Sequence, residues 1–250
     1  MISVCMATYN GERFIKEQLL SILSQISLTD EIIVSDDGSS DKTLKIIEEI
    51  EDSRIKLYHH KKEEENGVYK NFRYATSNFE NALTKAKGDY IFLSDQDDIW
   101  EQNKLQKCLE LLKKYDCIVH NYSVINEKGE LLKFQQFKKK PIHKSIFMNI
   151  LDNHFRGCCM AFNRKILNMI LPFPRRIIGH DYWIGILASH YTSVYYEIEP
   201  LLKSRWYNES VSARKKTNIS YKLQFRIDLL IETIKKIILR KGEKIDTITK

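Results

Sequence analysis

Three aspartates packed into four positions follow an apolar run in the stretch YIFLSDQDDIW, residues 90–100. The run 90–94 is predicted to be a buried strand, and Asp95, Asp97 and Asp98 come where it ends. Carboxylates this close disfavour joint ionisation unless a positive group lies among them. Mg²⁺ or Mn²⁺ is such a group, because it prefers oxygen ligands and completes its shell with water and substrate phosphates. The pattern therefore indicates a diphosphate held through a metal; the alternative is a solvated loop with an incidental helix cap.

A second acidic pair, Asp36 and Asp37, lies in SDDGSSD after another short apolar run. Carboxylates at a strand end can accept the imide N–H of uracil or thymine, or a ribose hydroxyl. Gly38 permits a tight turn, but it belongs to neither the dinucleotide glycine fingerprint nor a phosphate-binding loop, so NAD and ATP are not expected. The alternative is an ordinary turn that caps the next helix.

Strands alternate with helices across the first half of the chain, which predicts an α/β fold with a mostly parallel central sheet flanked by helices. Ligands of such sheets bind beyond the carboxyl ends of the strands. The polar residues Thr8, Tyr9 and Asn10 end the first strand, so they should face the same crevice as the two acidic clusters. The predicted strands cover 2–7, the run EIIV, 55–59, 90–94 and 117–122, and the predicted helices cover 12–25, 41–51, 70–86 and 101–115.

The second half is less regular. A hairpin is expected around residues 127–129 and an extended segment over 193–207. The other expected elements are a strand over 155–162 and helices over 144–151, 163–170, 181–190 and 220–240.

The chain has 250 residues, a net charge of +7 and a pI of about 9.0. A basic balance suits nucleic acid, an anionic membrane surface or a phosphate-bearing ligand. The excess is concentrated in KFQQFKKKPIHK and in residues 214–250. Five cysteines without metal-binding spacing predict reduced thiols in a cytoplasmic protein. Neither a membrane-spanning run nor a signal peptide is expected from the pattern.

The chain resembles a known enzyme family in five segments that occur in order: VCMATYNGERFIKEQLLSILSQ, DEIIVSDDGSSDKT, AKGDYIFLSDQDDIW, RGCCMAFNRKI and GHDYWI. Together they are similar to the inverting family-two glycosyltransferases with the GT-A fold, and most of all to bacterial rhamnosyltransferase-like members that build surface polysaccharide. The resemblance implies a GT-A domain over 1–212, with a nucleotide-binding half, 1–100, and an acceptor half, 101–212.

The resemblance also implies roles for individual residues. Asp95 and Asp97 would bind the metal, and Asp98 would support the loop or touch the donor sugar. The nucleotide would lie against the ends of the first, second and fourth strands, at Thr8, Tyr9, Asn10, Asp36, Asp37 and Asp95.

On the acceptor side, the resemblance implies that Asp181 is the general base, which removes a proton from the acceptor hydroxyl in a single displacement. An N-cap role for Asp181 is compatible with this. The other implied donor or acceptor contacts are Arg156, Gly157, His180, Trp100, Trp183 and Arg205. Gly157 and the two tryptophans could equally be structural. Arg205 would clamp the diphosphate, and Tyr207 stands where relatives often have a histidine.

Residues 213–250 are basic, with Leu223, Ile227, Leu230, Ile234 and Ile238 at helical spacing. This predicts a basic amphipathic C-terminal helix on anionic lipid, where lipid-linked acceptors reside. The alternative is a helix packed on the catalytic domain or on a second subunit, as in a homodimer.

The interpretation is a metal-dependent inverting glycosyltransferase that uses Mn²⁺ or Mg²⁺ and a nucleoside diphosphate sugar. dTDP-L-rhamnose is favoured over UDP-galactose or another UDP-hexose, and the acceptor is a glycan or its lipid-linked precursor. The expected location is the cytoplasm, with peripheral contact at the inner face of the membrane.

Two other functions are weighed against this interpretation. A sugar-nucleotide nucleotidyltransferase usually has a glycine-rich, basic N-terminal loop, which MATYNGERF does not supply. A nucleic-acid binder would leave the aspartates without a role, so nucleic acid is not expected as a partner.

Overall fold

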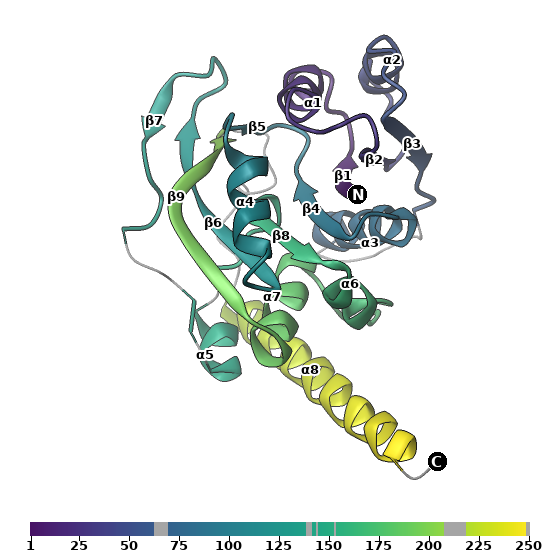
Figure 1. The fold of residues 1–250 in the computed structure, drawn as a ribbon, viewed down its shortest axis with the longest axis vertical. Helices are drawn as coiled ribbons and strands as arrows, with labels where there is room; N and C mark the ends of the chain where they lie inside the picture. The colour runs from purple at the N-terminus through teal and green to yellow at the C-terminus, as the bar shows by residue number, and fades with distance from the viewer. Residues whose placement is uncertain (63–69, 139–141, 144, 153, 208–218, 249–250) are drawn as a thin grey trace.

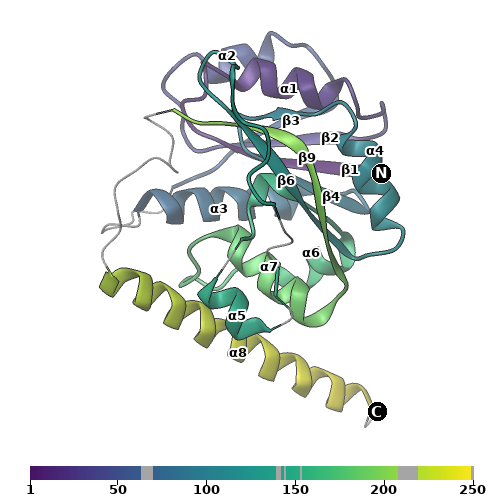
Figure 2. The same ribbon diagram turned by 90° about the vertical axis from the view of Figure 1, so that its left-hand side faces the viewer.

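The computed structural model describes residues 1–62, 70–138, 142–143, 145–152, 154–207 and 219–248. In this part of the chain a nine-stranded sheet runs through the molecule in the order β3-β2-β1-β4-β8-β6-β9-β5, with β7 paired to β6. Helices cover both faces of the sheet (Figure 1 and Figure 2). The predicted α/β class is confirmed.

[[FIG1]]

[[FIG2]]

The N-terminal half of the sheet is entirely parallel. It contains β1 (Ile2–Thr8), β2 (Glu31–Asp36), β3 (Ile55–His59) and β4 (Tyr90–Ser94). β1 and β2 are almost wholly buried, as expected for strands covered on both faces. Thr8 pairs with Asp36, and Met6 pairs with Ser94. The register therefore brings the carboxyl ends of β1, β2 and β4 to one level.

The antiparallel pairs lie in the second half of the sheet. It contains β5 (Ile99–Trp100), β6 (Cys117–Ile125), β7 (Leu131–Lys133), β8 (Met160–Asn163) and β9 (Val194–Arg205). β8 lies antiparallel between β4 and β6, and β9 runs parallel to β6 and antiparallel to β5. The expected hairpin is present as β6 and β7, with Gly129 at a positive φ of 84°.

Two apolar layers hold the helices to the sheet. One layer contains buried side chains from α1 (Ile15–Leu23), α2 (Thr43–Glu48) and α4 (Lys104–Leu112). The other contains side chains from α3 (Lys70–Lys85), α6 (Arg164–Ile170) and α7 (His180–Tyr191). Both faces of the sheet are thus buried, and the strand ends remain the place where polar groups collect.

The helices expected over 12–25, 41–51 and 101–115 are each shorter in the structure, and two further elements differ more. The strand predicted over 155–162 starts as a 3₁₀ turn, η1 (Gly157–Cys159), and becomes β8 only afterwards. The last helix is longer than predicted, since α8 spans Ile219–Ile248. It packs on α5 (Ile146–Leu151) and α7. The predicted boundary between residues 212 and 213 lies outside the described residues.

Among the described helices, α8 included, none is both long and apolar enough to cross a membrane.

Candidate active site

Gln96 joins the ends of β1 and β4. Its side-chain oxygen accepts hydrogen bonds from the Thr8 hydroxyl (2.5 Å) and the Tyr9 N–H (2.8 Å). Its side-chain amide donates to the Tyr9 carbonyl at 3.1 Å. The end of β2 is attached as well, because the Asp37 N–H donates to the Thr8 carbonyl at 2.9 Å. The polar ends of three strands therefore form one continuous surface.

The loop after β1 places Tyr9 at the rim of this surface. Asn10 takes a positive φ of 49°, which asparagine tolerates better than most residues. Its N–H donates to the Ser39 hydroxyl and its side-chain oxygen accepts from the Ser40 N–H, both at 2.9 Å. The Tyr9 ring is 50% exposed. The ammonium group of Lys62 lies 3.7 Å from its centroid. Tyr9 thus offers an aromatic surface beside a cation.

Asp36 and Asp37, called here the β2 carboxylates, are both buried. Asp36 accepts hydrogen bonds from the Gly38 and Ser39 N–H groups, both at 2.9 Å, and from the Ser39 hydroxyl at 2.5 Å. Gly38 has a φ of 78°, so the turn needs a residue without a Cβ there. The Asp36 carboxylate is enclosed by its own turn, and the nucleotide contact expected for it stays a prediction.

Asp37 is paired differently. One carboxylate oxygen lies 2.8 Å from His60 Nδ1, and the other lies 3.3 Å from Lys62 Nζ. Both partners come from the end of β3, so the position of Asp37 is determined by the strand beside it. Because Lys62 also lies over the Tyr9 ring, the carboxylate, the ammonium and the aromatic face belong to one corner.

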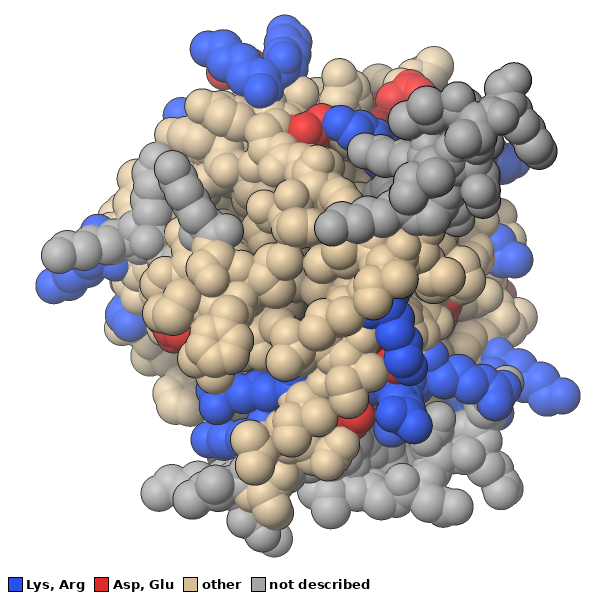
Figure 3. Space-filling view, turned by 90° about the horizontal axis from the view of Figure 1, so that it is seen from below, with Lys and Arg blue, Asp and Glu red and all other residues tan. Residues whose placement is uncertain are grey.

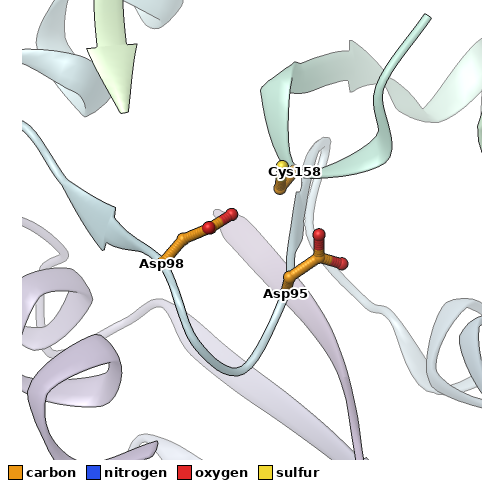
Figure 4. A group of neighbouring side chains, drawn as sticks. All are labelled: Asp95, Asp98 and Cys158. Carbon is orange, nitrogen blue, oxygen red and sulfur yellow. The ribbon is translucent and has the colours of Figure 1, made fainter. Parts of the chain in front are cut away.

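Asp95, Asp97 and Asp98, called here the β4 carboxylates, lie together in the loop between β4 and β5. Asp98 extends its carboxylate towards Asp95, and Cys158 enters from η1 on the other side (Figure 4). The ligand atoms of Asp95, Asp98 and Cys158 all lie within 4.8 Å of one another. Burial, followed by the charges of the neighbouring carboxylates, raises the pKa of Asp95 to about 8. Burial and then Asp98 raise the pKa of Asp97 to about 6. The protein thus keeps three acids where their negative charges repel one another.

[[FIG4]]

Arg156 provides positive charge beside this group. Its guanidinium lies 4.6 Å from the centroid of the Tyr122 ring and donates to the Tyr122 hydroxyl (3.1 Å) and the Ser204 hydroxyl (2.9 Å). Its charge lowers the pKa of carboxyl groups from two separate parts of the chain: Asp95, Asp97 and Asp181. Arg156 therefore connects the β4 carboxylates electrostatically with the start of α7.

Asp181 lies in the first turn of α7. Its carboxylate accepts a hydrogen bond from the Tyr182 N–H at 2.9 Å. Burial raises its pKa to about 6. At pH 7 the group is therefore mostly a carboxylate with a raised affinity for a proton, which is the property that a general base requires.

His180 and Gly157 hold this corner together from inside. The His180 ring stacks on Phe79 with centroids 3.8 Å apart. Its Nε2 is buried and has no hydrogen-bond partner among the described residues. Burial lowers its pKa to about 3, so the ring is neutral. A Cβ at position 157 would collide with this Nε2. Gly157 is thus needed for internal packing, the structural alternative expected for it, and the His180 Nε2 lies against Gly157; the substrate contacts expected for both residues stay predictions.

Known proteins of one family are similar to this chain over most of its length. A sequence profile described as Glycosyl transferase family 2 matches residues 3–171. A glucosyltransferase from Escherichia coli, WfgD, is 31% identical over 76% of this chain and 71% of its own length. The chain belongs to glycosyl transferase family 2. The resemblance seen in the sequence and the enzyme class, a glycosyltransferase, are confirmed.

Other family 2 relatives differ in what their names state. The Escherichia coli enzyme is described as a UDP-Glc:α-D-GlcNAc-diphosphoundecaprenol β-1,3-glucosyltransferase. A Shigella flexneri protein, RfbG, is described as a dTDP-rhamnosyl transferase and is 29% identical over 88% of this chain and 77% of its own length. An uncharacterized glycosyltransferase of Rickettsia typhi is 29% identical over 82% of this chain, and the match spans 64% of that relative.

Solved structures confirm the GT-A fold for this family 2 chain. Staphylococcus aureus TarS, residues 1–349 with UDP-GlcNAc, superposes with a TM-score of 0.68 at 16% identity, covering 90% of this chain and 64% of that one. The Pyrobaculum calidifontis mannosyltransferase PcManGT, with GDP-Man and Mn²⁺, gives a TM-score of 0.58 at 18% identity, covering 94% and 64%.

The β4 carboxylates fit the divalent metal that the family resemblance implies. Asp98 is 2% exposed, and its Oδ2 finds no hydrogen-bond partner in the described part of the chain. A buried carboxylate oxygen with no partner is costly unless a cation occupies the space in front of it. Asp95 and Asp97 supply further oxygens of the kind that Mg²⁺ and Mn²⁺ prefer. The Cys158 Sγ lies with the ligand atoms of Asp95 and Asp98, and its neighbour Cys159, followed by burial, raises the pKa of its thiol.

Arg205 and the two tryptophans are not where a substrate could use them. The Arg205 side chain donates to the carbonyls of Asp97, Asn126 and Glu127 and to the Glu17 carboxylate, and only 5% of the residue is exposed. It therefore holds the loop of the β4 carboxylates in place, and its guanidinium is already occupied by these bonds. Trp183 is fully buried and donates its indole N–H to the Ile170 carbonyl at 3.0 Å. Trp100 is 3% exposed and tilts against Phe92, so neither indole face can stack on a sugar.

Sequence reasoning gives no role to two residues that shape the site, Gln96 and Lys104, and notes a third, Tyr207, only by its departure from relatives. Gln96 lies between two aspartates, and no local pattern in the sequence predicts its bonds to Thr8 and Tyr9 at the end of β1. Lys104 is fully buried and donates to the Cys158 carbonyl at 2.8 Å, but in the sequence it looks like any helix lysine. Tyr207 donates its hydroxyl to Asp97 at 2.7 Å. The signal for Tyr207 in the sequence is that relatives often have a histidine at this position.

Proposed function

We propose that this chain is a metal-dependent inverting glycosyltransferase that moves a sugar from a nucleoside diphosphate to a hydroxyl of a bacterial envelope glycan or its precursor. One observation carries the proposal. The η1 turn contacts both groups, since Cys158 lies with Asp95 and Asp98 and Gly157 packs against His180, the neighbour of Asp181, so the proposed diphosphate site and base lie on either side of one turn. A single displacement needs both, since the leaving group and the attacking hydroxyl lie on opposite sides of the anomeric carbon.

Each group has a defined task. Asp181 accepts the proton of the acceptor hydroxyl as that oxygen forms its bond to the anomeric carbon. The bond from that carbon to the diphosphate breaks, and the electron pair leaves with the nucleoside diphosphate. Asp95, Asp97 and Asp98 would hold Mn²⁺ or Mg²⁺, which supplies positive charge to the departing phosphates. Arg156 adds fixed positive charge to the same region and keeps Asp181 more acidic than burial alone would make it.

The corner formed by Tyr9, Asp37 and Lys62 suits the nucleoside. Tyr9 can stack on a base, and Asp37 can accept an imide N–H, which thymine and uracil carry. dTDP-L-rhamnose stays the favoured donor, supported by the 29% identity to a protein described as a dTDP-rhamnosyl transferase. The second candidate is a UDP-hexose, which the 31% identity to a described UDP-glucose enzyme favours. The acceptor proposed is a glycan on a lipid diphosphate, like the one named for that enzyme.

The test separates the base from the binding site. Asp181→Asn should lower transfer by about 10²–10⁴-fold, the usual contribution of a positioned base, and leave nucleotide binding intact. Binding is measured by thermal shift with dTDP, UDP, GDP and CDP in Mn²⁺ or chelator. Asp116→Asn is the matched control, because Asp116 lies at the other end of the sheet, where it bonds Asn163 and Ser193. Near-normal turnover in Asp181→Asn would remove that residue from the mechanism, and no Mn²⁺-dependent nucleotide shift at all would sink the proposal.

A further inference from the structure

α8 carries two apolar faces, and the described protein covers only one of them. Leu229 and Thr233 are buried against the rest of the molecule, with 1% and 0% exposure. Leu223, Ile227, Ile234 and Ile238 recur at steps of four and seven residues, so they share another face of the helix. They are 41–63% exposed. Of the five residues in the predicted stripe, only Leu230 packs against the core.

α5 continues this surface. It packs beside α8, and the Arg226 guanidinium donates to the Leu151 carbonyl at 2.7 Å. Its buried residues are Asn149 and Ile150, whereas Phe147, Met148 and Leu151 are 40–58% exposed. We call the exposed apolar residues of α5 and α8 the apolar ridge: Phe147, Met148, Leu151, Leu223, Ile227, Ile234 and Ile238. Soluble monomers rarely leave so many large apolar side chains together in water without a partner for them.

The charge of the chain is concentrated on the same segment. Residues 213–250 contain eleven of the 40 Lys and Arg residues and only four of the 33 Asp and Glu residues. The rest of the chain therefore has equal numbers of both signs, and the whole net charge of +7 belongs to this segment. In the view from below, uncharged residues cover much of the face, with Lys and Arg beside them (Figure 3). Apolar side chains bordered by cations complement an anionic bilayer surface.

[[FIG3]]

α8 connects the ridge with the neighbourhood of the candidate base, because another face of the helix contacts α7. Phe225 of α8 packs edge-on against Tyr182, with ring centroids 5.0 Å apart, and Tyr182 follows Asp181 directly. A membrane that receives the ridge would thus lie within the width of one helix of the start of α7. That is where an acceptor attached to a membrane lipid must present its hydroxyl.

We propose that the apolar ridge is a docking surface for an anionic membrane and presents the Asp181 side of the crevice to lipid-linked acceptors. The statement about acceptors rests on the proposed function; the docking itself does not. A second copy of the chain is a poorer occupant, because pairing two ridges would bring two segments of +7 together. Nucleic acid would satisfy the cations but leave the apolar side chains in water.

The experiment is co-sedimentation of the full chain with vesicles of phosphatidylcholine, with and without phosphatidylglycerol. The wild-type chain should bind the anionic vesicles, and added salt should weaken that binding. The double variant Ile234→Glu/Ile238→Glu should bind roughly tenfold or more weakly, since it puts two anions into the apolar face. Both residues are exposed, so the fold should persist, and the Mn²⁺-dependent nucleotide thermal shift checks this.

The matched control is Leu28→Glu/Leu132→Glu, which changes two exposed leucines away from the ridge and should bind like wild type. Equal vesicle binding by the ridge variant and wild type would overturn the proposal, as would absence of wild-type binding. A dimer that dissociates in the ridge variant would assign the ridge to a second copy, and binding to duplex DNA alone would assign the cations to nucleic acid. Transfer to a soluble acceptor analogue should be unchanged in the ridge variant, so loss of docking and failure of the proposed function remain distinguishable.

Discussion

The β2 and β4 carboxylates both end buried parallel strands, yet the protein treats them in opposite ways. Asp36 receives two backbone N–H groups and a hydroxyl, and Asp37 is paired with His60 and Lys62. The β4 carboxylates repel one another, and the buried Oδ2 of Asp98 has no partner among the described residues. The first cluster is complete as it stands, whereas the second is arranged for a positive group from outside.

Two acidic clusters at the ends of neighbouring parallel strands can thus have different roles. Their hydrogen-bond and ion-pair partners distinguish these roles better than the sequence does. In the β2 carboxylates, the bonds fix the shape of a recognition corner, and removing one partner should damage the fold. In the β4 carboxylates, the strain between charges favours cation binding, and removing one carboxylate should damage function while relieving the fold. Substitutions of the same kind in the two clusters should therefore act with opposite sign on stability.

The largest expected effect is the loss of sugar transfer in Asp98→Asn. The remaining amide oxygen can still accept the Arg205 N–H, which Asp98 Oδ1 accepts at 3.2 Å, so the loop should keep its shape. The unpartnered Oδ2 becomes an NH₂ group, which cannot bind a cation. We expect transfer to fall roughly a hundredfold or more, at the upper end of what even outer partners of a metal site cost. Mn²⁺ affinity, followed by electron paramagnetic resonance, should fall with it.

Asp89→Asn is the control for that substitution, because it makes the same charge change on a side chain that is 73% exposed and paired with the N-terminus. It should leave both transfer and Mn²⁺ affinity at wild-type levels. If Asp98→Asn also kept its Mn²⁺ affinity, the contrast between the two clusters would lose its main support.

Asp36→Asn should have the next largest effect, on stability. Asparagine presents an NH₂ group towards backbone N–H donors, so at least one buried hydrogen bond is lost and replaced by repulsion between donors. The expected cost is about 2–3 kcal/mol, within the range for leaving a buried polar group unsatisfied. Thermal unfolding should then begin about 4–10 °C earlier for a chain of this size. Ser39→Ala removes only one of the three bonds and should cost about 1 kcal/mol; an Asp36→Asn melt no lower than that of Ser39→Ala would contradict the interpretation.

The sequence predicts the parallel half of the sheet well, because apolar runs and helical periodicity are local signals. The convergence of Thr8, Asp37 and Asp95 follows from that half alone, since strand ends of a parallel sheet meet at one edge. The antiparallel half is different. Arg156 reaches the crevice only because β8 returns beside β4, and no local pattern encodes that pairing. The sequence allows Trp183 to stack on a sugar, but in the structure its indole N–H donates to the Ile170 carbonyl inside the core.

A third prediction concerns pH in the absence of metal. The folded-state pKa of Asp95, about 8, lies above its ordinary value of 3.8, so the folded state holds the proton more tightly than the unfolded state. That contribution to stability is complete below about pH 4 and is lost as pH rises through about 8. Wild-type protein in chelator should therefore melt at least a few degrees lower at pH 8 than at pH 5.

Asp95→Asn resembles the protonated carboxyl, so it should show a smaller loss of melting temperature between the same two pH values. Adding Mn²⁺ at pH 8 should raise the wild-type melting temperature but not that of the variant. Parallel pH profiles for the two proteins in chelator would show that the β4 carboxylates do not strain the fold.

The smallest effect, and the finest test of the comparison, is expected at Tyr207. Its hydroxyl donates to Asp97, whereas the Oδ2 of Asp98 has no partner among the described residues, and burial raises the pKa of Tyr207, so it remains a donor. By occupying one oxygen of Asp97, it leaves the other free to face a cation.

Tyr207→Phe should weaken Mn²⁺ binding about fivefold, the value of one net hydrogen bond. Tyr115→Phe, which changes a ring stacked on Tyr195 elsewhere, should leave Mn²⁺ binding unchanged. Tyr207→His should restore or exceed wild-type affinity, because imidazole can itself bind the metal. If phenylalanine and histidine behaved alike, the hydroxyl would have no part in orienting Asp97, and the site would depend on Asp95 and Asp98 alone.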